Sequence, residues 1–249
     1  MEAALSRNVR ILPDAEAVAH TAARIFCSAA AVAISQRGRF SVALSGGKTP
    51  QQLYRMLADT YREHIRWDLT HLFWSDERCV PADHEQSNFR LAREELISRI
   101  SIPAGNIHRV KGELAPEEAA KKYEHDLRTH FGPEGIPAFD LILLGLGSDG
   151  HAASLFPGAE TLSETERLAV PAFSASAGNW RVTLTLPVLN SSPLVVFLVT
   201  GKTKAEIVTE ILAKGKRDPY PAGAISPQHG RIVWLLDSDA ASGMQQKPS

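Results

Sequence analysis

The chain has 249 residues, with 27 Lys and Arg balanced by 28 Asp and Glu and a formal net charge of −1. This balance leaves no basic surplus to follow a phosphate backbone, so it argues against nucleic acid as a partner. The length allows one large α/β domain or two small ones. Two cysteines, Cys27 and Cys79, are too few for a disulfide framework, which favours an intracellular, cytoplasmic protein.

The sequence predicts no targeting signal, no membrane-spanning segment and no metal-binding motif. Residues 1–10 lack the apolar stretch of a signal peptide. The apolar run over 22–34 includes Arg24 and Ser28 and is shorter than the roughly 18 residues that span a membrane, so it predicts a buried helix. The Cys and His residues have no spacing typical of a structural zinc site. We therefore expect a protein that needs no membrane, metal or cofactor.

The first part of the chain alternates strand and helix. In chain order, it predicts a strand over 9–12, a helix from Asp14 to about Gly38, a strand over 40–44, a helix from Pro50 to about Asp59, a strand over 69–74, a polar loop over 75–86, and a helix from Ser87 to about Arg99. Asp14 and Ser87 are typical N-caps. Thr49 is expected to cap the helix that begins at Pro50.

The rest of the chain continues the alternation. It predicts, in order, a helix over 116–131, a strand over 139–144, strands over 181–186 and 194–200, a helix over 203–212, and a last strand over 231–236. Strands separated by helices indicate parallel pairing, so the predicted fold is a doubly wound, mostly parallel α/β sheet with helices on both faces. We expect one domain over 1–237 and a flexible tail over 238–249.

The first candidate binding segment follows the strand over 40–44. It reads Ser45-Gly46-Gly47-Lys48-Thr49-Pro50 and precedes a helix. Two glycines allow a ligand to approach the backbone, and the start of a helix favours an anion. We expect a phosphate or other anion site here in preference to a simple tight turn. A nucleotide-binding P-loop is excluded, because the pattern needs a glycine where the chain has Val42.

The second segment, Ser75-Asp76-Glu77-Arg78, also follows a strand. An Arg in a cleft can bind a phosphate with two hydrogen bonds, and a neighbouring carboxylate would orient it. Taken alone, this segment is equally typical of a solvated loop. Arg181 at the start of a strand and Lys204 between a strand and a helix are further candidate anion ligands, although each fits a surface charge as well.

The third segment is Gly145-Leu146-Gly147-Ser148-Asp149-Gly150-His151, after the strongly apolar strand over 139–144. Its glycine pattern matches a dinucleotide fingerprint, but that fingerprint must open a long helix, and Pro157-Gly158 stops the chain too soon. His151 stands close to Asp149 in a glycine-rich turn. A neutral imidazole there can act as a general base while the carboxylate holds its tautomer, although a lone His is more often a core residue.

Together, and in this order, these segments closely resemble the 6-phosphogluconolactonases. The matching pieces are 45–50, 75–80, Ser87-Asn88, 145–158, 181–187 and 201–204. The resemblance implies that His151 is the general base, that Asp149 orients it, and that a sugar-phosphate lactone is the substrate. It also implies that Arg78 and Lys204 hold the phosphate with the loop over 45–49. Asp76 and Arg181 would belong to the substrate site.

Two other functions stay open. Glucosamine-6-phosphate deaminases share the same fold and similar segments, but they carry a catalytic glutamate five residues after the histidine, where this chain has Phe156. They also favour Asp-Glu-Tyr where this chain has Asp76-Glu77-Arg78. A non-catalytic sugar-phosphate sensor on the same fold is the second alternative. We expect a monomer, since the sequence shows no extended apolar surface stripe.

Overall fold

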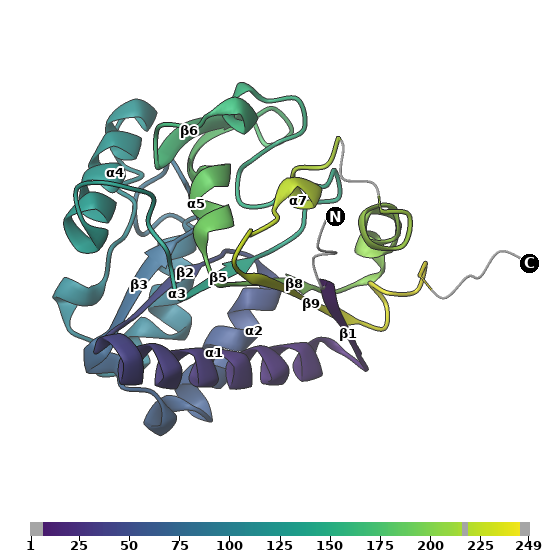
Figure 1. The fold of residues 1–249 in the computed structure, drawn as a ribbon, viewed down its shortest axis with the longest axis horizontal. Helices are drawn as coiled ribbons and strands as arrows, with labels where there is room; N and C mark the ends of the chain where they lie inside the picture. Colours follow the sequence, from purple (N-terminus) through teal and green to yellow (C-terminus); the bar gives the residue numbers. More distant parts are fainter. Residues whose placement is uncertain (1–6, 216–218, 245–249) are drawn as a thin grey trace, which may run out of the picture.

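A parallel sheet forms the centre of the molecule (Figure 1). The computed structural model describes residues 7–215 and 219–244, and within them the sheet has six strands in the order β1-β9-β8-β5-β2-β3. Every neighbouring pair is parallel. The strands are β1 (Arg7–Leu12), β2 (Phe40–Leu44), β3 (Thr70–Trp74), β5 (Leu141–Leu144), β8 (Leu194–Val199) and β9 (Arg231–Asp237). The predicted α/β class is confirmed.

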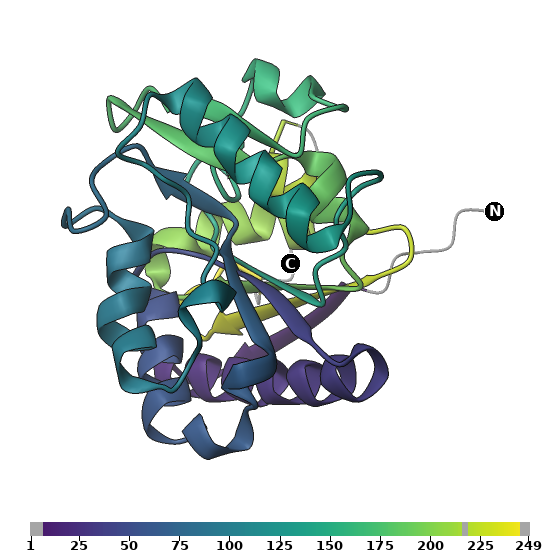
Figure 2. The same cartoon turned by 90° about the vertical axis from the view of Figure 1, so that its left-hand side faces the viewer.

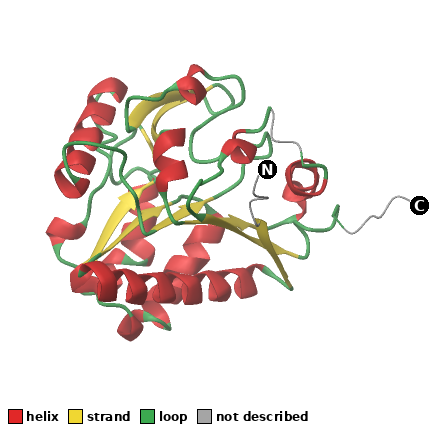
Figure 3. Cartoon of the chain, viewed as in Figure 1, coloured by secondary structure: helices red, strands yellow, loops and turns green. Residues whose placement is uncertain are grey.

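Helices cover both faces of this sheet (Figures 2 and 3). One layer contains α1 (Ala15–Arg37), α2 (Lys48–Asp59) and α3 (Asn88–Glu95), and the other contains α4 (Pro116–Phe131), α5 (Leu186–Ser191), α6 (Ala205–Val208) and α7 (Pro221–Ala224). Successive strand residues point to opposite layers. Val42 and Leu44 belong to the core cluster under α1, whereas Ala43 belongs to the cluster under α4. Burial on both faces explains why the strands are continuous apolar runs.

Helix α1 corrects one expectation about length. By length and composition alone, this 23-residue helix is apolar enough to cross a membrane, although the sequence suggested that no run came close. Its isolated polar residues do not interrupt the helix. The structure places it along the sheet, where Val18 and Phe26 are buried and Phe26 packs edge-on against Phe40 of β2. It is packed as a core helix.

Two predicted helix starts are confirmed and one is wrong. The side chains of Asp14 and Ser87 accept backbone hydrogen bonds at the starts of α1 and α3. Helix α2, however, begins at Lys48 with Gly47 as its N-cap, because Gly47 adopts a φ of 108° and turns the chain two residues earlier than expected. The Thr49 hydroxyl instead hydrogen-bonds the hydroxyl of Thr200 at 2.7 Å.

A second, antiparallel sheet lies over the α4 layer and was not predicted. Its strand order is β4-β7-β6, formed by β4 (Asp76–Arg78), β7 (Asn179–Leu184) and β6 (Ala169–Ser174). The expected polar loop over 75–86 is therefore wrong for its first residues. A three-residue strand is too short to show a period of two, and β4 is charged because its side chains serve a cavity.

Two segments near the C-terminus also differ from expectation. The helix predicted over 203–212 is a 3₁₀ turn (Lys202–Lys204), the short α6 and a π-helical turn (Thr209–Ala213). The tail expected over 238–249 does not start at 238, because Ala240 and Ala241 are fully buried in the core. Residues 245–249 lie outside the described part of the chain.

Candidate active site

A cavity of about 280 Å³ opens where the chain connections diverge from the centre of the sheet. Strands β2 and β5 are neighbours, but β2 leads outward to β3, whereas β5 leads to β8 on the other side. Ligands of open α/β sheets bind at such a switch point, beyond the carboxyl ends of the strands. Ser45 and Gly145, the first residues after β2 and β5, both line the cavity.

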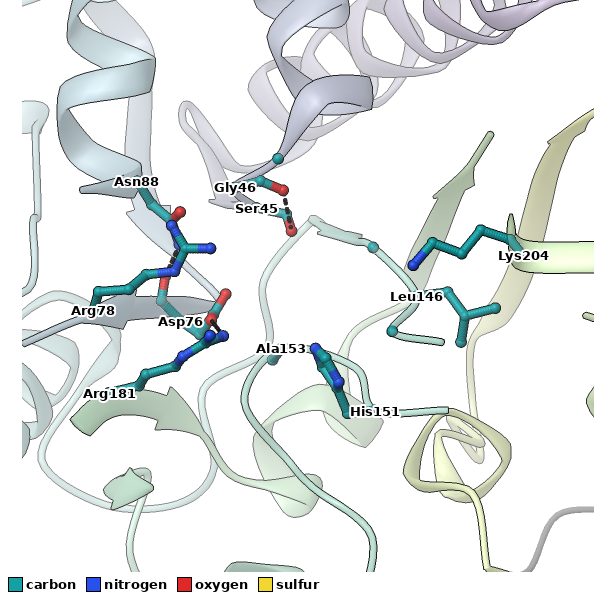
Figure 4. A pocket seen from close by; sticks show the side chains of 13 residues that line it. Ser45, Gly46, Asp76, Arg78, Asn88, Leu146, His151, Ala153, Arg181 and Lys204 are labelled. Atoms are coloured by element: carbon teal, nitrogen blue, oxygen red, sulfur yellow. Dashed lines mark hydrogen bonds and ion pairs between the residues drawn. The ribbon is translucent and has the colours of Figure 1, made fainter. Parts of the chain in front are cut away.

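Most residues predicted from the sequence meet at this cavity (Figure 4). Those that line it are Ser45, Gly46, Gly47, Asp76, Arg78, His151, Arg181 and Lys204. Lys48 and Thr49 do not; they line an adjoining hollow that shares Gly46, Gly47 and Lys204 with the cavity. Asp149 is absent from the lining and instead contacts His151. Five parts of the chain that are far apart in the sequence thus form one site.

The Tyr54 side chain, which belongs to α2, fixes the turn between β2 and α2. The Tyr54 hydroxyl donates to the Ser45 carbonyl at 2.5 Å and accepts from the Ser45 N–H at 3.1 Å. A Cβ on Gly46 would lie 1.8 Å from Asn88 Oδ1, so only glycine fits there. Because no side chain caps α2 and Pro50 has no N–H, the N–H groups of Lys48 and Thr49 are the ones available for an anion in the adjoining hollow.

Strands β4 and β7 bring two guanidinium groups to the cavity wall. Ser154 Oγ donates to Asp76 Oδ2 at 2.6 Å, and the other partner of that carboxylate is Arg181, 3.9 Å away. Burial lowers the pKa of Arg181, while the charge of Asp76 opposes the change. Arg78 Nη1 donates to the Gln86 carbonyl at 2.5 Å, whereas its buried Nε has no partner among the described residues. That unused donor suits a bound anion.

Glu77 fixes the opposite side of β4 and was not predicted as a functional residue. It is 2% exposed and accepts backbone N–H groups of Arg78, Asn88 and Phe89 at 2.7 to 2.8 Å. Burial raises its pKa to about 7, although these three hydrogen bonds oppose the rise. The carboxyl group thereby ties β4 to the first turn of α3 and sets the positions of Arg78 and Asn88.

Asn88 is the second residue that the sequence reasoning missed as a ligand. Its Nδ2 donates to the Asp76 carbonyl at 2.8 Å, and its Oδ1 is buried without a donor among the described residues. The side chain lines the cavity. The amide thus connects β4 to the loop of Gly46 at the cavity wall. The only sequence signal was the Ser87-Asn88 pair in the family resemblance.

His151 and Asp149 form a close pair at the cavity. His151 Nδ1 donates to Asp149 Oδ1 at 2.6 Å, and the His151 N–H reaches the same oxygen at 3.2 Å. Because an ionised carboxylate only accepts, Nδ1 carries the proton and Nε2 is the basic nitrogen. The ring points into the cavity (Figure 4). Burial raises the pKa of Asp149, but the charge and hydrogen bonds of His151 outweigh it, and the net pKa is lowered.

The loop that carries this pair depends on Gly150. Gly150 adopts a φ of 82°, and a Cβ on it would meet the Tyr220 ring at 2.6 Å. The Ala222 N–H donates to the Gly150 carbonyl at 3.0 Å. The segment that begins with α7 therefore holds the loop of His151 in place. Residues 151–158 form turns rather than the helix that a dinucleotide site requires.

Phe156 stands between the histidine and a guanidinium. Its ring lies 4.9 Å from the His151 ring, measured between centroids, and Arg181 lies 5.6 Å from the Phe156 centroid. These contacts orient both groups through ring packing and a cation–π interaction. No acid or base is supplied by this position.

Lys204 faces the cavity from the side opposite to Arg78 and Arg181 (Figure 4). It ends the 3₁₀ turn that follows β8, and it also lines the hollow at the start of α2. Burial lowers the pKa of its ammonium group, while the charge of Asp149 opposes the change. The site thus combines one oriented imidazole with three cationic side chains and a helix start, which together suit an anionic substrate that reacts with water.

This fold and this site define a sugar-phosphate enzyme of the α/β class, and the comparisons give the family. Residues 13–234 match the glucosamine-6-phosphate isomerase/6-phosphogluconolactonase family, to which the chain belongs. It is 40% identical to the 6-phosphogluconolactonase of Nostoc sp. over 96% of this chain and 98% of that one. It is 41% identical to the human 6-phosphogluconolactonase, over 82% and 81% respectively.

A solved structure gives the same result. The crystal structure of 6-phosphogluconolactonase from Thermotoga maritima is 34% identical, covers 93% of this chain and all of that chain, and superposes with a TM-score of 0.81. The family named by the match includes both lactonases and isomerases, so the residues of the site have to separate the two activities.

Proposed function

We propose that this protein hydrolyses 6-phospho-D-glucono-1,5-lactone to 6-phosphogluconate, the second step of the oxidative pentose phosphate pathway. The observation that carries the proposal is the His151–Asp149 pair at 2.6 Å, with the basic Nε2 directed into a cavity lined by cationic side chains. The relatives named above support the same activity. The proposed site residues are those that the sequence indicated, with Asn88 added.

The proposed reaction starts with a water molecule between His151 Nε2 and the lactone carbonyl carbon. His151 takes a proton from this water as its oxygen bonds to the carbon. The tetrahedral intermediate then collapses, the bond to the ring oxygen breaks, and the imidazolium returns the proton to that oxygen. Asp149 keeps Nδ1 protonated throughout and stabilises the transient imidazolium charge. The step needs no acyl-enzyme, metal or nucleotide.

The developing oxyanion needs a hydrogen-bond donor or a positive charge at the cavity. The Gly147 N–H donates to the His151 carbonyl at 2.8 Å, and the Gly150 N–H donates to the Gly147 carbonyl at 3.1 Å, so these two amides are occupied. We assign the role to the Arg181 guanidinium, which lines the cavity. A charge held by Asp76 and Phe156 at a fixed position is suited to this task.

The substrate phosphate is assigned to Arg78, Lys204 and the backbone of the loop over 45–49. The unpaired Arg78 Nε and the uncapped start of α2 both offer N–H donors to an anion. Ser45, Gly46, Gly47, Lys48 and Thr49 remain proposed ligands on this basis, Lys48 and Thr49 from the adjoining hollow.

Phe156 favours a lactonase over an amino-sugar phosphate isomerase. A deaminase would need a carboxylate close to the histidine. Here Phe156 takes that place, and its ring centroid lies 4.9 Å from that of His151. Hydrolysis of an activated ester needs only one general base and a positioned water, which the site supplies.

The test follows proton release from freshly prepared 6-phosphogluconolactone, with and without a chelator. A blank without enzyme is subtracted, because the lactone also opens spontaneously. We expect enzymatic hydrolysis well above this blank, and we expect the chelator to leave its rate unchanged. Progress equal to the blank would overturn the proposal. Ammonia release from glucosamine-6-phosphate would then indicate an isomerase, and tight 6-phosphogluconate binding without turnover would indicate a sensor.

Binding of the product should weaken at alkaline pH through Lys204. Its pKa is lowered from the usual 10.5, so the free protein loses this positive charge at a lower pH than an exposed lysine would. We expect the Kd of 6-phosphogluconate to rise about tenfold per pH unit above that pKa. Lys204→Arg should remove this alkaline limb, because arginine stays charged. Lys202 is exposed, so Lys202→Arg is the matched control, and its Kd should still rise at alkaline pH in calorimetric titrations. If the Kd of Lys204→Arg rose as much as that of wild type, the assignment would be contradicted.

We further propose a cytoplasmic monomer without membrane or nucleic-acid partners. The balanced net charge and the absence of a disulfide between Cys27 and Cys79 support this proposal. Light scattering of the purified protein at several concentrations tests the monomer, and a mass of two or more chains would overturn it.

A further inference from the structure

Three histidines gather on the side of the sheet that carries α4. His71 belongs to β3, His108 follows the 3₁₀ turn over 104–106, and His130 lies in the last turn of α4. One nitrogen from each ring lies within 4.8 Å of the other two. The His71 and His130 ring centroids are 4.5 Å apart, and those of His108 and His130 are 5.1 Å apart. All three rings are half-buried.

We propose that His71, His108 and His130 bind a zinc ion, with water as the fourth ligand. Three imidazoles and a water are a ligand set that zinc commonly takes. Zinc–nitrogen bonds of about 2.0 to 2.1 Å in a tetrahedron place the nitrogens roughly 3.4 Å apart. His71 Nδ1 and His108 Nε2 are already 3.1 Å apart, close to this spacing, and the His130 nitrogen lies within 4.8 Å of both.

The surroundings hold these rings as metal ligands are usually held. Both carboxylate oxygens of Asp126 lie 3.1 Å from His108 Nδ1, which fixes the tautomer with the lone pair on Nε2. Phe73 stacks on the same ring at 4.1 Å and 2°. The buried Ser41 hydroxyl contacts His130 Nε2 at 2.8 Å and fixes the third ring.

A carboxylate also lies beside the cluster. Asp126 contacts the His108 ring and supplies a negative charge that favours a bound cation.

The proposed zinc site is separate from the catalytic cavity. His71 is paired in register with Ser41 near the amino ends of β3 and β2, whereas the cavity lies beyond their carboxyl ends. The four steps from His71 to Ser75 span about 13 Å along an extended strand. A zinc ion here would connect β3, the segment before α4 and the end of α4, and its expected effect is on stability rather than on catalysis.

The test is calorimetric titration of zinc into the metal-free His151→Ala protein. That background removes the other oriented histidine, so binding reports on the three-histidine site. We expect one zinc per chain and a thermal midpoint raised by roughly 5 to 10 °C at free zinc a hundredfold above Kd. His108→Ala should weaken binding at least a hundredfold. Asp126→Asn, which preserves size, should weaken it about 10- to 100-fold.

The matched control is His229→Ala, which removes an exposed histidine in the loop before β9 and should leave zinc affinity unchanged. Circular dichroism without metal checks the fold of each variant, and Asp126→Asn decides the matter if His108→Ala fails to fold. Absence of binding at about 100 μM zinc, or binding that neither variant weakens, would overturn the site. Neither result bears on lactone hydrolysis.

Discussion

Replacing His151 with alanine is expected to lower kcat for lactone hydrolysis at least hundredfold. A positioned general base contributes about 10² to 10⁴ in rate, and Nε2 of this ring is the basic nitrogen that the site directs at the substrate. The KM should change little, because the proposed phosphate contacts through Arg78 and Lys204 remain. The side chain is 27% exposed and lies outside both core clusters, so the fold should persist.

Steady-state rates, corrected for spontaneous lactone opening, measure this effect. His229→Ala serves as the control, since it removes an exposed histidine far from β5 in the chain. Asp149→Asn should give an intermediate loss, because a neutral amide can donate as well as accept and so neither fixes Nδ1 as the donor nor stabilises the imidazolium charge. A His151→Ala kcat within about threefold of wild type would exclude the general-base role and leave the substrate-binding groups as the source of catalysis.

Replacing Gly147 with alanine is expected to lower kcat about 10- to 100-fold without removing any catalytic group. A Cβ at this position would lie 2.1 Å from His151 Nδ1 and 2.5 Å from Asp149 Oδ1, too close for both side chains to stay in place. The pair has to separate or rotate. A displacement of about 1 Å at a reacting group costs on the order of a hundredfold in rate.

The comparison with Gly105→Ala separates this local clash from a general cost of losing glycine. A Cβ on Gly105 meets nothing within 4 Å, so its variant should retain wild-type kcat. Rates and thermal midpoints are measured for both. If Gly147→Ala kept normal kcat, the loop would have shifted as a unit, and the close approach of backbone to His151 would not matter for catalysis.

The local features of the sequence predicted the central sheet well. Strands buried on both faces are continuous apolar runs, and the caps Asp14 and Ser87 act within their own helices. Neither depends on distant contacts. The carboxyl ends of parallel strands share one edge, so the segments after β2 and β5 could be expected to meet, and they do at the cavity.

Features that depend on distant partners were not predictable. β4 is a strand only because β7, about a hundred residues later, pairs with it. Asn88 becomes a cavity residue because Glu77 binds its backbone N–H and fixes the start of α3. The His71, His108 and His130 cluster likewise has no local spacing pattern, because a strand, a loop and a helix each supply one ring.

Thr49 shows a different kind of failure. Threonine before proline is a typical helix start, but Gly47 can adopt a backbone conformation that threonine avoids, and it begins the helix earlier. Gly47 and Thr49 are both acceptable N-cap residues, and the sequence alone did not show which of them would begin the helix. The Thr49 hydroxyl then found a tertiary partner instead.

The pairing of β1 with β9 sets the order in which the chain can fold during synthesis. Arg7 to Leu12 pair in register with Ile232 to Asp237, and β1 lies at the edge of the sheet with β9 as its neighbour. The first strand to leave the ribosome therefore waits for the last, across the longest loop closure in the sheet. The strands from β2 to β8 can assemble beforehand. Completion of the sheet, with the docking of β1, thus has to follow the emergence of β9 from the ribosome.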